Sequence, residues 1–213
     1  MEEKNYLADI TEIKNMMSKS SQFLSLSGLS GVLAGIYALI GALAAFRIMD
    51  ASGMLGNRYY TLQNQSYTGI DRNAVTALLV VAAAVFILSG ASAFFLSRAK
   101  ARKQGEKIWN SVSRRLLGTM MIPLVTGGIF ALLLLRHGIF AMVAPVTLIF
   151  YGLSCVMASR YTFRDIHYLG ISITAIGLVA TALPGYGLLF WALGFGICHI
   201  IYGSIMHFKY DRK

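Results

Sequence analysis

Nine carboxylates and four histidines are the side chains on which acid–base or metal chemistry in this 213-residue chain would depend. Every carboxylate lies outside the long apolar runs or at their edges, which argues against a buried carboxylate relay or sodium site. The sequence also lacks paired carboxylates for hydrolysis, the HExxH zinc pattern, a Walker-type glycine loop and the GxSxG nucleophile turn. We therefore expect no enzymatic activity, no catalytic residue, no cofactor and no nucleic-acid partner.

Two of the histidines, His167 and His207, lie at similar depth near the ends of the last two apolar runs and could approach each other. A metal ion there would need further ligands, and the plausible donors nearby are Asp165, Asp211 and Cys155. No ligand spacing supports such a set. We expect no metal site, and histidines that contact headgroups or backbone at the membrane interface.

His199 lies deeper, about 20 Å below the turn near Gly185 by the helical rise per residue. The same count brings several hydroxyls and a thiol to its level. This band is either a small-molecule pocket or a polar latch of interhelical hydrogen bonds. In both cases we expect a neutral His199 imidazole bonded to the hydroxyl of Ser172 or Tyr151. The candidate polar intramembrane site comprises His199, Ser172, Tyr151, Ser154, Tyr202 and Cys155.

Membrane-spanning helices are the elements that must position these residues. The chain is 56% hydrophobic and 13% charged, with a mean hydropathy of +0.63, which excludes an ordinary soluble domain. A span needs about 20 apolar residues. The pattern predicts an all-α polytopic membrane protein whose six helices form three in–out–in hairpins, with a turn at Pro184–Gly187 between the last two helices. Within a transmembrane domain of residues 23–208, the expected spans are 24–46, 74–97, 116–135, 139–159, 167–183 and 187–208.

The basic residues predict the orientation of these spans. Fifteen of the 19 Lys and Arg residues lie before the first span, between the second and third, between the fourth and fifth, or after the sixth. The positive-inside rule places these segments, and both termini, in the cytoplasm. Residues 1–22 carry apolar side chains at helical spacing and predict an amphipathic cytoplasmic helix, and residues 209–213 form a basic cytoplasmic tail.

Three surface features each leave two interpretations open. The basic segment from Arg98 to Arg115, with Trp109 inside it, either docks anionic lipid or an acidic protein partner, or serves only to orient the chain. The long outer loop, residues 47–73, is either a binding surface or a solvated loop. The first span carries small residues at four-residue spacing, which indicates close packing within the bundle or a homodimer through this helix. One such register is Ser27, Gly31 and Gly35, and the other is Ser30, Ala34, Ala38 and Ala42.

Two apolar runs carry a resemblance to known proteins: FLSLSGLSGVLAGIYALIGA at residues 23–42 and PGYGLLFWALGFG at residues 184–196. The chain resembles uncharacterised six-helix bacterial inner-membrane proteins along its whole length. The resemblance implies a location in the bacterial cytoplasmic (inner) membrane and no assigned activity. The expected function is that of a non-enzymatic accessory, sensory or partner- or lipid-binding membrane protein, which contacts membrane lipids and a protein partner at its cytoplasmic face. The alternative is a small transporter or channel with its polar site around His199.

Overall fold

The computed structural model describes residues 23–54, 72–105 and 108–211, and this part of the chain contains helices and no strands. Among the described residues, six helices are long and apolar enough to cross a membrane, as the predicted all-α membrane class requires. The predicted amphipathic helix of residues 1–22 and most of the outer loop lie outside the described residues. The elements are α2 (Gly28–Ala51), α3 (Arg72–Lys103), α4 (Ser111–Arg136), η2 (Phe140–Met142), α5 (Val143–Ala158), η3 (Ser159–Tyr161), α6 (Asp165–Ala182), α7 (Gly187–Trp191), η4 (Ala192–Cys198), α8 (His199–Met206) and η5 (His207–Asp211).

The last four elements, α7 to η5, form one continuous span from Gly187 to Asp211, in which η4 and η5 are π-helical. The turn before this span is the expected one, because α6 ends at Ala182 and Gly185 has a positive φ of 92°. A second tight turn follows α4, where Gly138 has a φ of 74°.

The helices extend beyond the predicted hydrophobic limits in several places. The second span was expected to end at residue 97, whereas α3 continues to Lys103. A hydropathy pattern places the end of a span at the first charged residue. The helix itself can continue, because Lys and Arg are good helix formers and are favourable near a helix C-terminus. The first helix, by contrast, begins at Gly28 rather than at residue 24, and the described residues before it, 23–27, are not helical.

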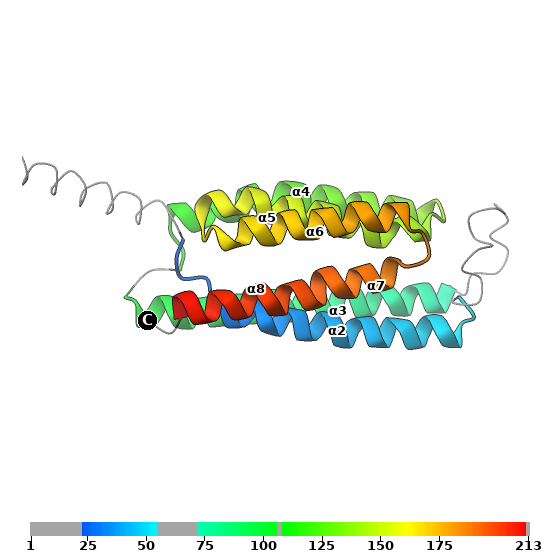
Figure 1. Cartoon of the computed structure of the whole chain (residues 1–213), viewed down its shortest axis with the longest axis horizontal. Coiled ribbons are helices and arrows are strands. Elements are labelled where there is room, and N and C mark those ends of the chain that lie inside the picture. Colours follow the sequence, from blue (N-terminus) through cyan, green and yellow to red (C-terminus); the bar gives the residue numbers. More distant parts are fainter. Residues whose placement is uncertain (1–22, 55–71, 106–107, 212–213) are drawn as a thin grey trace, which may run out of the picture.

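Figure 1 shows two layers of helices: α4, α5 and α6 lie together, and α2, α3 and the last span lie together. Within the described chain, α3 packs along α2, and α5 packs along both α4 and α6. The last span packs along α2 more extensively than along α6, its neighbour in the sequence. The last two helices thus belong to different layers and do not pack as a simple hairpin. The in–out–in course of the three predicted hairpins stays a prediction.

Glycines explain why the last span lies against α2. A Cβ atom added to Gly203 would lie 2.5 Å from the backbone nitrogen of Val32, and one added to Gly35 would lie 2.6 Å from the carbonyl oxygen of Gly196. Only glycine permits backbones to approach this closely. The Gly31–Gly35 face of the first span is thus covered inside the monomer, which accounts for this register by internal packing. The predicted homodimer through this helix stays a prediction.

The two layers meet in a buried cluster of Leu148, Leu169 and Ile173, which Phe190 and Phe195 of the last span complete. Leu148 and Ile173 have no exposed surface. Elsewhere, large apolar side chains such as Phe86 and Ile87 on α3 are more than 60% exposed. Exposed apolar surface of this extent is expected of helices whose outer faces contact lipid.

Candidate functional site

The imidazole of His199 lies at the start of α8 and is 6% exposed. Its Nε2 atom is 2.8 Å from the hydroxyl oxygen of Tyr151 on α5, and its Nδ1 atom is 3.1 Å from the carbonyl oxygen of Gly194. A carbonyl oxygen only accepts hydrogen bonds, so Nδ1 donates to Gly194, and in the neutral ring Nε2 then accepts from the Tyr151 hydroxyl. The structure contains the predicted bond to Tyr151, and the predicted neutral state of the ring stays a prediction.

Aromatic rings surround this pair. The ring centroid of Phe195 lies 5.0 Å from that of Tyr151 and 6.1 Å from that of His199. The ring centroid of Trp191 lies 5.0 Å from that of Phe195. Phe195 and Gly194 both belong to the π-helical segment η4. Wider turns of this kind are rare and frequently occur at functional sites.

The structure brings together only some of the six predicted site residues. Cys155 is buried one turn after Tyr151, whereas Ser172 bonds to Tyr202 at 3.2 Å rather than to His199. Ser154 is fully buried and donates to the carbonyl of Phe150 in its own helix. No buried side-chain nitrogen or oxygen in the described residues lacks a hydrogen-bond partner. The band therefore consists of two interhelical hydrogen-bonded pairs, Tyr151–His199 and Ser172–Tyr202. Paired polar groups of this kind are expected of a polar latch.

The two shallower histidines lie apart from this band. His207 is 3.1 Å from a carboxylate oxygen of Asp211, and His167 is 3.4 Å from the hydroxyl of Ser159. No group of three or more His, Cys, Asp or Glu side chains in the described ranges is placed to hold a metal ion.

A second polar cluster lies at the end of the bundle that contains the described C-terminal residue, and we call it the Asp211 cluster. The Asp211 carboxylate accepts hydrogen bonds from the Lys100 ammonium at 2.7 Å, the Gly28 amide at 2.9 Å, His207 at 3.1 Å and the Ser27 hydroxyl at 3.3 Å. Its side chain is 11% exposed and that of Lys100 is 13% exposed. Together they join the start of the first span, the end of α3 and the end of the last span.

Helix electrostatics explain this arrangement. Gly28 is the first residue of α2, whose unpaired amides carry partial positive charge that a carboxylate stabilises. Lys100 adds a bond to the carbonyl of Leu26 at 3.0 Å and lies 5.3 Å from the centre of the Phe163 ring. Sequence reasoning placed Lys100 in the basic segment that either docks lipid or an acidic partner or orients the chain, and it missed the cluster. The one available signal was a single acid, Asp211, at the end of an apolar span among basic residues.

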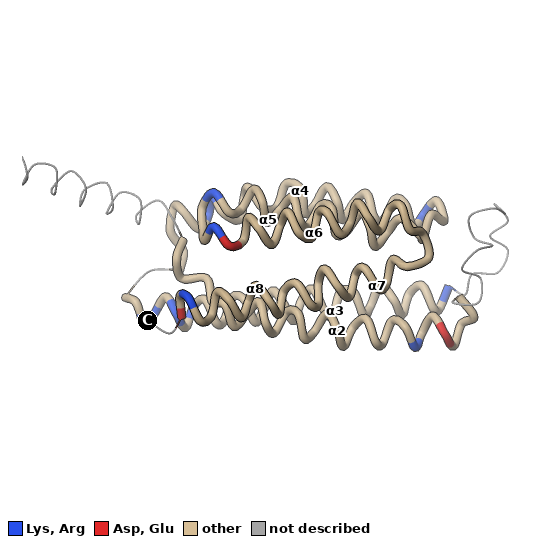
Figure 2. The backbone as a smooth tube through the Cα atoms, in the orientation of Figure 1, with Lys and Arg blue, Asp and Glu red and all other residues tan. Residues whose placement is uncertain are grey.

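The same end of the bundle carries exposed cations, which we call the basic rim. Figure 2 shows Lys and Arg residues at both ends of the helices, with more of them at this end. Apart from Lys100 and Lys209, which pair with Asp211 and Asp165, none of the described rim cations forms an ion pair. Trp109, 63% exposed, and Phe208, 60% exposed, lie beside them in the sequence. The exposed, unpaired members of the basic rim are Arg98, Arg102, Lys103, Arg114, Arg115, Arg160 and Arg164.

Comparison of the chain with protein-family models, with curated proteins and with solved structures finds no match. The six apolar helices of the described residues indicate a multi-pass membrane protein.

Proposed function

We propose that this protein is a non-enzymatic accessory or sensory component of the bacterial cytoplasmic membrane, and that its basic rim engages anionic lipid headgroups. The observation that carries the proposal is the set of seven exposed, unpaired cations at one end of six apolar helices. Clusters of Lys and Arg beside a span attract anionic lipid with about 1 kcal/mol per residue. An exposed Trp109 suits the headgroup level, where indole rings are enriched.

The proposed orientation follows from the same residues. With the basic rim in the cytoplasm, the chain crosses the membrane six times and both termini lie inside. The basic rim then faces the anionic inner leaflet and any acidic protein that docks on it.

Energy transfer from Trp109 tests the proposal at the basic rim itself. In a Trp191→Phe background, Trp109 is the only indole, because the chain has two tryptophans. Dansyl-labelled phosphatidylglycerol should accept energy from it at lower lipid fraction than dansyl-labelled phosphatidylcholine. The pair Arg114→Gln and Arg115→Gln should weaken that preference at least about fivefold, and 0.5 M salt should reduce it.

Arg47→Gln is the matched control, since Arg47 is exposed but lies at the opposite end of the first span. Equal transfer from both lipids in the parent protein would contradict the lipid proposal. Stoichiometric co-purification of an acidic protein that the Arg114→Gln and Arg115→Gln pair abolishes would replace lipid with a protein partner.

A small transporter or channel is the second candidate, and the π-helical segment η4 before His199 favours it. If His199 carries a ligand or a proton, His199→Leu should leave a folded protein that has lost transport after reconstitution. If the Tyr151–His199 pair is a latch, the same variant should change only stability.

A further inference from the structure

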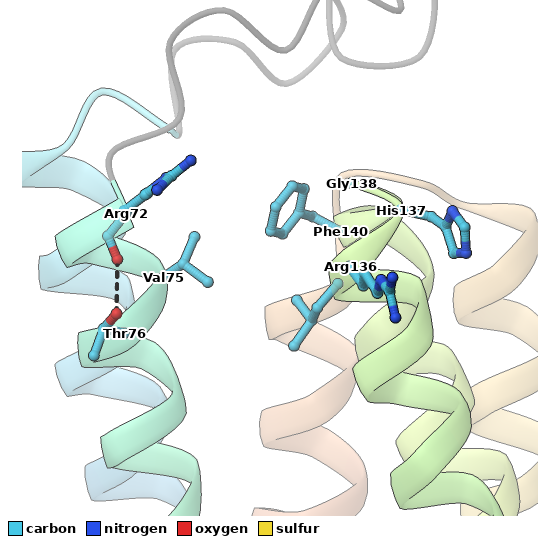
Figure 3. A pocket seen from close by; sticks show the side chains of 8 residues that line it. Arg72, Val75, Thr76, Arg136, His137, Gly138 and Phe140 are labelled. Atoms are coloured by element: carbon cyan, nitrogen blue, oxygen red, sulfur yellow. Dashed lines mark hydrogen bonds between the residues drawn. The ribbon is translucent and has the colours of Figure 1, made fainter.

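A cleft between α3 and α4 opens at the end of the bundle opposite the basic rim (Figure 3). Its volume is about 480 Å³, which lies within the range of small-ligand sites. Arg72, the first residue of α3, and Arg136, the last residue of α4, line its mouth, and Val75, Leu135 and Phe140 line its apolar part.

Packing explains why the cleft exists. The one element with which α3 makes extensive contact in the described chain is α2, and α4 packs mainly on α5, so the facing sides of α3 and α4 have no protein neighbour. One turn further into the bilayer, Leu79 and Leu132 lie on the same helix faces as Val75 and Leu135 and are 41% and 58% exposed. Apolar side chains therefore line both walls of the space between α3 and α4, a surface suited to a lipid acyl chain.

The order of residues along the cleft suits an amphipathic molecule with an anionic head and an apolar chain. Arg72 and Arg136 lie at the helix ends that border the cleft, and Val75 and Leu135 lie next to them toward the middle of the helices. Neither Arg72 nor Arg136 forms an ion pair with another described residue, and both are exposed. Thr76 is the hydroxyl of the cleft, and it donates to the carbonyl of Arg72 at 2.9 Å, as Figure 3 shows. The lining also includes the imidazole of His137, and its permanently charged donors are the two arginines.

We propose that the α3–α4 cleft binds an anionic phospholipid, with its headgroup at the end of the cleft that Arg72 and Arg136 border and an acyl chain along Val75 and Leu135. Arginine forks are suited to two-point hydrogen bonding with phosphate oxygens. The lipid completes the surface between the two layers of helices and holds them at a fixed separation at this end. This site does not depend on the basic rim, which lies at the other end of the bundle.

Quenching by brominated lipid tests the proposal. In a Trp109→Phe, Trp191→Phe background, Phe140→Trp places an indole in the wall of the cleft. The protein is reconstituted in phosphatidylcholine vesicles, and either brominated phosphatidylglycerol or brominated phosphatidylcholine is added. We expect phosphatidylglycerol to quench at a lower mole fraction. Leu132→Trp is a second reporter, which replaces an exposed side chain and so does not disturb packing.

The arginines should account for the selectivity. Arg72→Gln and Arg136→Gln should each reduce the preference for phosphatidylglycerol about fivefold, and the double variant about 25-fold, at about 1 kcal/mol for each cation near the membrane surface. Arg47→Gln, at the same end but outside the cleft lining, should change the preference less than twofold.

Equal quenching by the two lipids, or an equal loss with Arg47→Gln, would overturn the proposal. So would the absence of quenching by either lipid from both reporters, since the cleft would then hold no lipid. Because these indoles report on the cleft and Trp109 reports on the basic rim, failure at one site is distinguishable from failure at the other.

Discussion

Replacing Asp211 by Asn tests whether the Asp211 cluster holds three helices together. Asn has nearly the same shape, but it removes the negative charge from a carboxylate that accepts four hydrogen bonds. It also places an amide NH₂ group among four donors, so at least one of them loses its acceptor.

The magnitude follows from the burial of the pair. Removing one partner of a fully buried ion pair costs about 3–5 kcal/mol, and one hydrogen bond to a charged group contributes about 1.5–3 kcal/mol. Asp211 and Lys100 are 11% and 13% exposed, and Lys100 keeps its bond to the Leu26 carbonyl in the variant. We therefore expect Asp211→Asn to reduce the free energy of unfolding by about 2–3 kcal/mol, at the lower end of these ranges.

The assay is unfolding in mixed micelles of mild detergent and dodecyl sulfate, followed by tryptophan fluorescence. Lys209→Gln is the control, because it breaks an ion pair with Asp165 in which Lys209 is 54% exposed, and we expect no measurable shift of the midpoint. Lys100→Met combined with Asp211→Asn should recover part of the loss, since it removes the unpaired ammonium. An Asp211→Asn midpoint equal to that of the parent would refute the role given to this cluster.

Two further predictions concern packing inside the membrane, and the same unfolding assay checks both. Tyr151→Phe should destabilise the protein by about 1 kcal/mol, because His199 loses its hydrogen bond to the Tyr151 hydroxyl. In a double-mutant cycle of Tyr151→Phe with His199→Leu, the coupling energy should be about 0.6 to 1.7 kcal/mol. A coupling energy of zero would mean that the pair contributes no stability. Gly152→Ala should destabilise by about 1–3 kcal/mol, because its Cβ would lie 2.7 Å from the carbonyl oxygen of Gly170. Gly90→Ala, with no atom within 4 Å of its Cβ, should not destabilise, and an equal loss in both glycine variants would contradict the packing account.

The parts of the structure that could be predicted from the sequence are those that depend on one helix at a time. Hydropathy over about 20 residues finds a span, and a proline next to glycines finds the turn at residues 184–187. The depth of a residue in the membrane can also be predicted by counting residues from a short turn along each of the helices that it joins, because the rise per residue is fixed. That count brought His199 and Tyr151 to one level, and their hydrogen bond is 2.8 Å long.

Contacts between helices distant in the sequence could not be predicted in this way. The Asp211 cluster joins residues separated by 111 and 183 positions, and no spacing rule connects them. The packing of the last span on α2 could not be predicted either, because it depends on glycines in both helices at once. The depth count also could not choose between Ser172 and Tyr151 as the partner of His199, because it gives height in the membrane and not rotation about the helix axis.

Reporter fusions test most directly the central claim, which is a six-span membrane protein with its basic rim in the cytoplasm. One fusion after Tyr60 follows the first span, and one after Lys103 follows the second. A phosphatase that is active only outside the cytoplasm should be active after Tyr60 and inactive after Lys103, and a fluorescent protein that folds only inside should show the reverse. Activity of the phosphatase in both fusions, or in neither, would contradict the orientation and with it the placement of the basic rim.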